Sequence, residues 1–427
     1  MKKYFYFCLL AFSTVCFSID YDFSSYTNYL TKEINKGNYP GFVTLIYKNG
    51  EIIFSDTRGF SDIEEEIPLK EDSLFRIYSM TKPITGVALM ILVEQGKVSL
   101  SDPVEKYIPE FKNTKVFNKK SKQLETLSRS LTILDLATHS SGLTYSFVDK
   151  GKVKEIYDRE EIYPYYFLDN ISLERPAKKS YSDNCTFSEK VATLPLVHQP
   201  GEKWTYSIGM DILGCVIERA ANQSFGEFLK KNIFDPLDMK DTFFEVPGSK
   251  QNRMIDLYAH KKGFPRYGVE TPDMKNFKNR KLFLLDPKED SFFFQKASIE
   301  DGGSGLVSTA NDYLKFAIML LNNGSLNGRK ILKPETVKIM TSNQVEKKAK
   351  PFGFDAFGMG VTIGVALDAK KMRMKRGDNS FFWGGAANTD FWVDPSNDLI
   401  FISMSQVLGS PEIDRKLERL VYKALGI

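Results

Sequence analysis

The sequence predicts an α+β fold in which a mainly antiparallel sheet is built from both ends of the chain and flanked by helices. Two strand-like runs near the start, residues 42–48 and 51–55, are joined by Asn49-Gly50, a strong signal for a tight β-hairpin. Further strand-like runs lie near the other end, at residues 360–367, 380–384, 390–393 and 399–405. Strand signals are sparse in between. A helical subdomain at about 104–299 is therefore expected to be inserted into a sheet subdomain formed by about 19–103 and 300–427.

The first 18 residues have the pattern of a secretory signal peptide. Two lysines precede an apolar stretch at residues 4–17, and Ser18 supplies a small residue at its end. The apolar stretch is too short to span a bilayer comfortably. We therefore expect residues 1–18 to be removed and the domain of residues 19–427 to be exported, either to the periplasm or out of the cell. A lipoprotein cleavage site at Cys16 is the alternative, although the residue before it is not small.

Helices and loops are placed by apolar periodicity and by residues typical of helix ends. An amphipathic helix is expected at residues 26–36. A last helix is expected to start with Ser410 as N-cap and Pro411 at its first position. The segments 144–195 and 246–297 are rich in charged and aromatic residues without clear periodicity. They predict long ordered loops over a cleft.

Composition argues against several classes of function. The formal net charge is +4 over 427 residues, and two of the lysines belong to the predicted leader, so no nucleic-acid partner is expected. The basic cluster at residues 370–376 is interpreted as a solvated hairpin tip. The three histidines have no metal-ligand spacing and no paired-cysteine motif exists, so no metal and no other cofactor is expected. No segment after the leader has the pattern of a transmembrane helix, and the oligomeric state stays open.

Only two cysteines, Cys185 and Cys215, remain after removal of the leader. An exported protein enters a compartment that permits disulfides, so one bridge is an option. Cys215 also falls in an apolar helical stretch, residues 212–220, where a cysteine serves equally well as a small buried apolar residue. Spacing alone leaves both interpretations open.

The feature with the clearest chemical meaning is Ser79-Met80-Thr81-Lys82. It follows a strand-like run, residues 74–78, and opens a strongly apolar helix. Ser79 is therefore expected at a strand-to-helix turn, near the positive end of the helix dipole. The spacing puts a hydroxyl and an amine one helical turn apart, where the lysine can take the serine proton. The alternative is a plain N-cap serine followed by a solvated lysine.

Four further segments follow Ser79 in a fixed order: residues 136–143 (LATHSSGL), 200–207 (PGEKWTYS), 302–309 (GGSGLVST) and 383–386 (WGGA). Together with the Ser-x-x-Lys they resemble the serine β-lactamase-related superfamily, in particular class C β-lactamases and most closely the family VIII carboxylesterases. The resemblance covers essentially the whole chain after the leader. It implies a β-lactamase/transpeptidase-like fold.

The resemblance also implies roles for individual residues. Ser79 would be the nucleophile, Lys82 its activating partner, and Tyr206 the phenol that passes protons to the leaving group. A phenol acts as a base only beside a cation, so Lys82 is expected close to Tyr206. The backbone N–H groups of Ser79 and Ala386 would form the oxyanion hole.

Two other motifs come close to known catalytic patterns. Ser182-Asp183-Asn184 matches the Ser-Asp-Asn motif of class A β-lactamases and penicillin-binding proteins, but the chain has no Lys-Thr-Gly partner. No helix signal follows it, so we interpret it as non-catalytic. Residues 302–306 (GGSGL) just miss the Gly-x-Ser-x-Gly elbow. They are expected to form a tight turn before a helix that starts near residues 309–312.

Two departures from the β-lactamase pattern bear on the substrate. Trp383-Gly384-Gly385 stands where β-lactamases and peptidases carry Lys-Thr-Gly, and Ile208 stands where they carry an asparagine. Both changes replace polar recognition with an apolar wall, and the two glycines suggest close approach of a substrate to the strand. The predicted function is ester hydrolysis on a small neutral acyl substrate. Acyl transfer, β-lactamase or D,D-peptidase activity, and a non-catalytic binding protein are the alternatives.

Overall fold

The computed structural model describes residues 21–162, 181–261 and 281–427. The predicted signal peptide, residues 1–18, and Cys16 lie outside the described residues. The central feature is an eight-stranded sheet with the order β12-β13-β14-β15-β16-β1-β2-β3, all neighbours antiparallel. Its strands are β1 (Gly41–Lys48), β2 (Glu51–Asp62), β3 (Ile67–Pro68), β12 (Phe357–Met359), β13 (Gly364–Ala366), β14 (Phe381–Gly385), β15 (Thr389–Asp394) and β16 (Leu399–Met404).

The two ends of the chain meet in the middle of this sheet. β1 pairs with β16 in the register Val43↔Met404 to Lys48↔Leu399. β1 and β2 form the predicted hairpin, whose turn residues Asn49 and Gly50 have φ of 51° and 92°. Positive φ at both central positions is the geometry of the tight turns that suit a twisted hairpin. The prediction of an α+β fold with an antiparallel sheet from both chain ends is confirmed.

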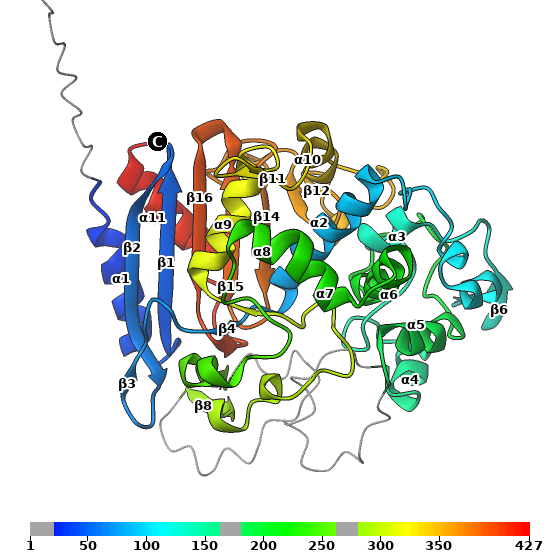
Figure 1. Cartoon of the computed structure of the whole chain (residues 1–427), viewed down its shortest axis with the longest axis horizontal. Helices are drawn as coiled ribbons and strands as arrows, with labels where there is room; N and C mark the ends of the chain where they lie inside the picture. The colour runs from blue at the N-terminus through cyan, green and yellow to red at the C-terminus, as the bar shows by residue number, and fades with distance from the viewer. Residues whose placement is uncertain (1–20, 163–180, 262–280) are drawn as a thin grey trace, which may run out of the picture.

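Helices cover both faces of the central sheet (Figure 1), and alternate residues of its strands pack against different helices. Phe42 and Ile46 pack with helices α1 (Ser24–Asn35) and α11 (Asp414–Leu425). Val43 and Leu45 pack into the main core with α2 (Thr81–Glu94) and α9 (Ala310–Leu321). The two-residue period of a strand thus gives the sheet two apolar faces, each covered by helices.

The last helix begins later than the sequence predicted. α11 starts at Asp414, with Ile413 at the N-cap position, so Ser410 and Pro411 precede the helix and do not cap it. Tyr39 Oη donates to the Pro411 carbonyl, which holds this segment on the sheet in a non-helical form. The helix packs on the protein through an apolar stripe, in which Leu417, Val421 and Leu425 are all buried.

The part of the chain between the sheet segments is rich in helices. They are α3 (Ile133–Ala137), α4 (Lys152–Arg159), α5 (Asn184–Ala192), α6 (Gly209–Ala221), α7 (Phe225–Leu229) and α8 (Asp235–Leu237), with α10 (Pro334–Met340) after α9. Small strands accompany them: β4 (Phe75–Arg76) with β9 (Val307–Ser308), β5 (Lys115–Asn118) with β6 (Gln123–Thr126), and β10 (Ser325–Leu326) with β11 (Arg329–Lys330). The first nine residues of α6 are all buried, and the helix packs against α2, α3 and α5.

Several local predictions are wrong. The two segments expected to be long loops contain α4, α5, and the strands β7 (Leu257–His260) and β8 (Leu282–Asp286), which join β17 (Val407–Leu408) in a three-stranded sheet. Parts of them, residues 163–180 and 262–280, lie outside the described residues. The expected strand at 360–367 is shorter, and the turn that Thr362 makes at φ 63° separates β12 from β13.

The basic cluster at residues 370–376 is not wholly solvated. Arg376 is buried, with its guanidinium 4.3 Å from the ring centre of Phe382 and 5.5 Å from that of Trp392. An arginine stacks on aromatic rings in this way at little cost in hydration. Among the described residues, no helix is both long and apolar enough to cross a membrane.

Candidate active site

Ser79 lies in a 3₁₀ turn, Tyr78–Met80, between the short strand β4 and helix α2. Tyr78 has a φ of 42°, which is uncommon for a residue other than glycine. The turn closes with a hydrogen bond from Met80 N to the Ile77 carbonyl, 3.0 Å long. The expectation of a strand-to-turn-to-helix setting for Ser79 therefore agrees with the structure, and the buried α2 carries Lys82 one turn further on.

The structure brings Ser79, Lys82 and Tyr206 together. Ser79 Oγ is 2.7 Å from Tyr206 Oη, and Lys82 Nζ donates to Ser79 Oγ over 3.1 Å. Lys82 Nζ also lies 4.8 Å from the centre of the Tyr206 ring. Lys82 is fully buried, and its Nζ donates hydrogen bonds to Ser79 Oγ and to the Gly303 carbonyl, the latter 2.7 Å away. A plain N-cap serine with a solvated lysine does not fit this arrangement.

The His139 ring packs against the ring of Tyr206. Its ring centre is 4.7 Å from that of Tyr206, and Nδ1 accepts the backbone N–H of Ser207 over 3.2 Å. Burial, with a smaller contribution from the Lys82 charge, lowers the pKa of His139 well below its ordinary value of 6.5. The imidazole is therefore neutral and carries its proton on Nε2. It positions Tyr206 without adding a charge.

A cavity of about 920 Å³ opens at Ser79. Ser79, Tyr206 and the predicted residues Trp383, Gly384, Gly385 and Ala386 line it. Much of the remaining wall is aromatic, from Tyr145, Phe147, Trp204, Phe352, Phe357 and Phe382. Three carboxyl groups, of Asp390, Glu412 and Asp414, also reach it. Burial raises the pKa of Asp390 to about 8, which keeps much of this carboxyl neutral at physiological pH.

Ile208 does not belong to this cavity. It is fully buried in the main core and stands at the N-cap position of α6, so the prediction that it forms part of the substrate wall is wrong. The Ile208 side chain points into the protein at the position where α6 begins, directly before Gly209. Trp383, by contrast, lines the cavity as expected.

The two glycines of β14 differ in what they accommodate. A Cβ at Gly385 would overlap Thr389 Oγ1 and the Ile77 carbonyl oxygen. β14 is therefore closely packed against the turn that carries Ser79. A Cβ at Gly384 would meet only ordinary contacts, with Thr389 O at 3.4 Å. The absence of a side chain at Gly385 is thus explained by packing inside the protein, whereas Gly384 leaves room on the cavity side.

Ser182-Asp183-Asn184 serves as a helix cap. Contrary to expectation a helix follows, α5, and Asp183 accepts the backbone N–H of Thr186 over 2.7 Å in a capping box. Ser182 donates to Asp183 over 2.9 Å, and Asn184 donates to Glu218 over 3.1 Å. None of the three lines the cavity at Ser79. These three residues therefore have a structural role at the start of α5, although their sequence matches a catalytic motif.

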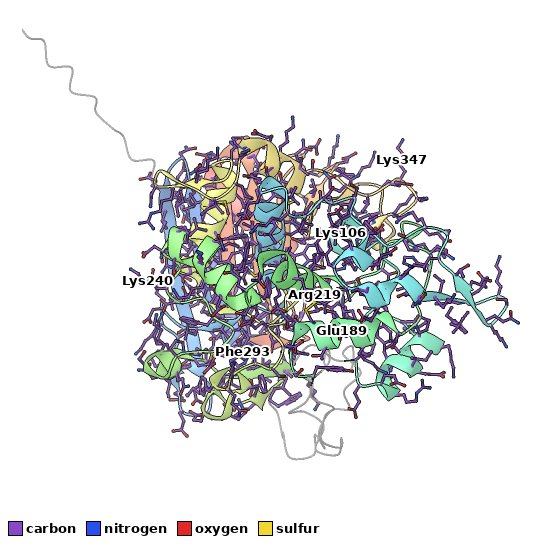
Figure 2. The ribbon with its side chains drawn as sticks, turned by 45° about the vertical axis from the view of Figure 1, so that its right-hand side comes forward. Lys106, Glu189, Arg219, Lys240, Phe293 and Lys347 are labelled. Atoms are coloured by element: carbon purple, nitrogen blue, oxygen red, sulfur yellow. A yellow bond between two sulfur atoms is a disulfide. The ribbon has the colours of Figure 1, made fainter. Side chains whose placement is uncertain are left out.

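Cys185 and Cys215 form a disulfide that joins α5 to α6. The ion pair between Arg219 and Glu189 joins the same two helices, and Figure 2 shows both side chains at this junction. Spacing alone allowed either a disulfide or a free buried Cys215, and the structure has the disulfide. Since α6 begins three residues after Tyr206, the disulfide anchors a helix that adjoins the site.

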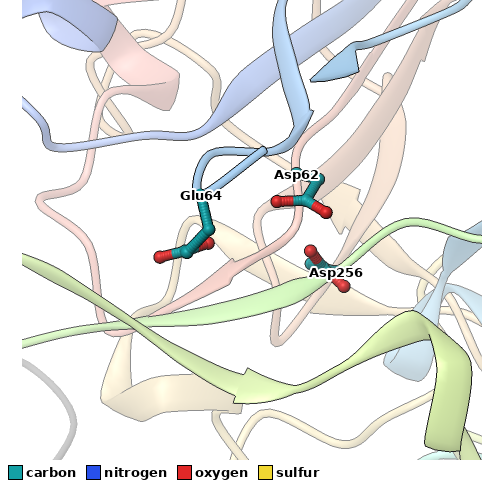
Figure 3. A group of neighbouring side chains, drawn as sticks. All are labelled: Asp62, Glu64 and Asp256. Carbon is teal, nitrogen blue, oxygen red and sulfur yellow. The ribbon is translucent and has the colours of Figure 1, made fainter. Parts of the chain in front are cut away.

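A group of three carboxylates, Asp62, Glu64 and Asp256, lies outside the cavity (Figure 3). Lys288 Nζ is 2.7 Å from Asp62 Oδ2, and the Lys288 backbone N–H donates to Asp256 over 2.8 Å. Tyr258 Oη donates to Glu64 over 2.6 Å. Donors of the protein itself thus satisfy all three carboxylates: Asp62 is in an ion pair, and Glu64 and Asp256 accept hydrogen bonds.

Sequence reasoning missed several residues of the site. Tyr145 lies 5.2 Å from the Tyr206 ring, and Lys82 Nζ is 5.6 Å from the Tyr145 ring centre. His139 and Trp204 lie within the motif segments 136–143 and 200–207, but the sequence pattern does not indicate a role for either residue. Asp211 and Asp301 are buried behind Lys82, and no local motif marks them. A buried carboxyl has no sequence signal of its own, because burial depends on distant parts of the chain.

The chain is similar to known proteins over most of its length. The family model described as Beta-lactamase matches residues 27–425. The chain belongs to the Beta-lactamase family. Protein Rv1367c of Mycobacterium tuberculosis (strain ATCC 25618 / H37Rv) is 31% identical over 92% of this chain and 96% of that protein. Esterase EstB of Burkholderia gladioli is 28% identical over 83% of this chain and 82% of its own length.

The fold of this Beta-lactamase family member is also found in solved structures. The structure titled "EstCE1, a hydrolase with promiscuous acyltransferase activity" superposes with a TM-score of 0.73 at 22% identity, over 93% of this chain and 97% of that chain. The β-lactamase/transpeptidase-like fold predicted from the sequence is confirmed. The protein is a serine hydrolase of the β-lactamase-related kind.

Proposed function

We propose that this protein is an exported carboxylesterase that works through an acyl-Ser79 intermediate. The observation that carries the proposal is the contact of Ser79 Oγ with both Tyr206 Oη, at 2.7 Å, and Lys82 Nζ, at 3.1 Å. A hydroxyl between a phenol and a buried amine has a route for its proton, which an unactivated serine lacks. The esterase relative is consistent with this chemistry.

In the proposed reaction, Ser79 Oγ attacks the ester carbonyl carbon and its proton passes into the Lys82–Tyr206 pair. The negative charge on the carbonyl oxygen is received by the backbone N–H groups of Ser79 and Ala386, two residues of the same cavity wall. The bond to the alcohol then breaks, and the alcohol leaves with the proton from Tyr206. Water attacks the acyl-Ser79 ester in the same way, which releases the acid and returns the proton to Ser79.

The cavity favours a neutral acyl substrate. Its wall is mostly aromatic near Tyr206, and Trp383-Gly384-Gly385 replaces the polar motif that would hold a substrate carboxylate. We therefore expect esters to be better substrates than penicillins or D-alanyl peptides.

The test compares hydrolysis of a short-chain nitrophenyl ester and a chromogenic cephalosporin by residues 19–427, by Ser79→Ala and by Tyr206→Phe. We expect ester cleavage with little lactam turnover, its loss in Ser79→Ala, and a fall in kcat of about 10²–10⁴-fold in Tyr206→Phe without unfolding. Full ester cleavage by Ser79→Ala would exclude the proposed nucleophile. Dominant lactam turnover would assign the site to β-lactams.

Acyl transfer to an alcohol is the second candidate. The cavity of about 920 Å³ is large enough to hold an acyl group and an acceptor together, and the solved structure EstCE1 is titled as a hydrolase with acyltransferase activity. Adding acceptor alcohols and analysing the products separates the two: new esters indicate transfer, and the free acid alone indicates hydrolysis. A fluorophosphonate probe that failed to label Ser79 would instead indicate a non-catalytic binding protein.

A further inference from the structure

Two buried carboxyl groups, of Asp211 and Asp301, lie directly behind Lys82. Both residues are only 1% exposed to solvent. Asp211 comes from the first turn of α6, and Asp301 comes from the loop that precedes β9. The backbone N–H of Gly303 lies between them, 3.1 Å from Asp211 Oδ1 and 2.6 Å from Asp301 Oδ1. Two carboxylates this close in a buried place cannot both carry a charge.

The proton of the pair belongs on Asp211. Burial, and next the charge of Asp301, raise the pKa of Asp211 well above its ordinary value of 3.8. Asp211 Oδ2 is buried and accepts no hydrogen bond from the residues that the structure describes. A proton on Asp211 relieves the repulsion between the two carboxyl groups, because Asp211 can then donate a hydrogen bond to Asp301.

Asp301 has the surroundings of a carboxylate. It accepts the backbone N–H of Gly303 at 2.6 Å and that of Ser304 at 2.8 Å, and the Ser304 hydroxyl donates to its other oxygen. A carboxylate is an acceptor with room for several donors, so three donors and a protonated neighbour stabilise one negative charge here.

One peptide unit connects this charge to Lys82. The N–H of Ser304 points to Asp301, and the carbonyl of the same unit, Gly303 O, accepts from Lys82 Nζ over 2.7 Å. The loop is also fixed to α2, because Thr85 Oγ1 donates to Gly302 O over 2.7 Å. Gly303 has no space for a side chain, since a Cβ would lie 2.9 Å from Tyr145 Oη and 3.0 Å from Asp211 Oδ2.

We propose that Asp211 and Asp301 form a carboxyl pair with a single shared proton, and that Asp301 is the positioning residue that orients Lys82 through the peptide unit between Gly303 and Ser304. The inference rests on the proposed function, in which Lys82 handles the Ser79 proton. Asp211 keeps the pair at one negative charge. This gives a role to the loop at residues 302–306, which the sequence marked only as a near miss of a nucleophile elbow.

The experiment compares Asp301→Asn with Asp211→Asn, using nitrophenyl ester kinetics. Asparagine resembles a protonated aspartate, so Asp211→Asn should lower kcat far less than Asp301→Asn. At position 301 the amide removes the charge and brings an N–H₂ group toward backbone donors. We expect kcat of Asp301→Asn to fall about 10²-fold with KM within about 3-fold, as for a misplaced catalytic group. Asp301→Glu should recover part of the loss.

Asp394→Asn is the matched control. Asp394 is the last residue of β15 and is fully buried. It accepts a hydrogen bond from the Gly377 N–H over 3.2 Å and has no hydrogen bond or ion pair with Lys82. Its replacement should lower stability but not kcat of the folded protein. Equal losses of kcat in Asp211→Asn and Asp301→Asn, or an equal loss in the control, would overturn the proposal.

A second measurement does not depend on activity or on the folding of the Asp301 variants. The infrared difference spectrum of wild type minus Asp211→Asn at neutral pH should contain the carbonyl band of a protonated carboxylic acid. A carboxylate band in its place would overturn the shared proton. If the wild type hydrolyses no ester, the proposed function fails, but this spectrum still decides the state of the pair.

Discussion

Gly385 shows how a single residue connects packing to the site. A Cβ at this position would clash with Thr389 Oγ1 and with the carbonyl oxygen of Ile77, which lies just before the turn that carries Ser79. We predict that Gly385→Ala lowers the free energy of unfolding by about 1–3 kcal/mol, because the strand must move. It should also lower kcat, since Ala386 and the Ser79 turn shift apart.

Gly384→Ala is the matched variant, one residue earlier on the same strand. Its Cβ has space, so thermal unfolding should stay within about 0.5 kcal/mol of wild type, and any change should appear in KM for bulky esters. Thermal unfolding and ester kinetics of both variants check the pair of predictions. Equal destabilisation by the two substitutions would contradict the role given to Gly385.

Glu218 links the residue scale to the element scale, because it holds α5, α6 and the start of α7 together. It accepts from Asn184 over 3.1 Å and from the Phe225 backbone N–H over 3.2 Å. Burial is the main reason that its pKa rises from 4.5 to about 7. The disulfide between Cys185 and Cys215 closes the same junction.

This pKa predicts a pH-dependent stability of the α5–α6 junction. A carboxyl with a folded-state pKa above its unfolded value stabilises the fold fully below pH 4.5, and this contribution is lost as the pH rises through about 7. The free energy of unfolding of wild type, relative to Glu218→Gln, should therefore fall between these pH values. Denaturant titrations of both proteins across this range measure the difference; a constant difference would contradict the prediction.

The elements that the sequence predicted well are those with local signals. The hairpin at Asn49-Gly50 depends on two residues that readily adopt positive φ, and the helix after Ser79 depends on an uninterrupted apolar run. The start of α11 was misplaced because Ser410 and Pro411 suit a helix start, yet the hydrogen bond from Tyr39 holds the chain there in another form. Tertiary contacts decided between two acceptable local structures.

At the scale of the whole molecule, the sheet separates two cores. Leu30 of α1 is fully buried in the core with α11, on the face of the sheet away from α2. Ile84 of α2 is fully buried in the main core, two residues after Lys82 on the same helix. The two side chains are similar in size and burial, and they differ in which core they fill.

We predict that Leu30→Ala and Ile84→Ala each lower the free energy of unfolding by about 2–5 kcal/mol, as expected for a cavity in a packed core. Only Ile84→Ala should also lower kcat of the folded enzyme, because it disturbs the helix that carries Lys82. Urea unfolding and ester kinetics at a temperature where both variants are folded provide the measurement. A loss of kcat in Leu30→Ala would show that the two cores are coupled across the sheet.

The sequence by itself determined the fold class, the family and the order of Ser79, Lys82 and Tyr206, because hairpin turns, apolar periods and short motifs are local properties of the chain. It placed Ile208 on the cavity wall wrongly, since the direction of a side chain depends on where the next helix begins. Only the tertiary structure decided that Asp211 lies beside Gly303, 92 residues further along, and that one peptide unit connects Asp301 to Lys82. Buried charges interact through space, and which of them meet is set by packing that no local pattern records.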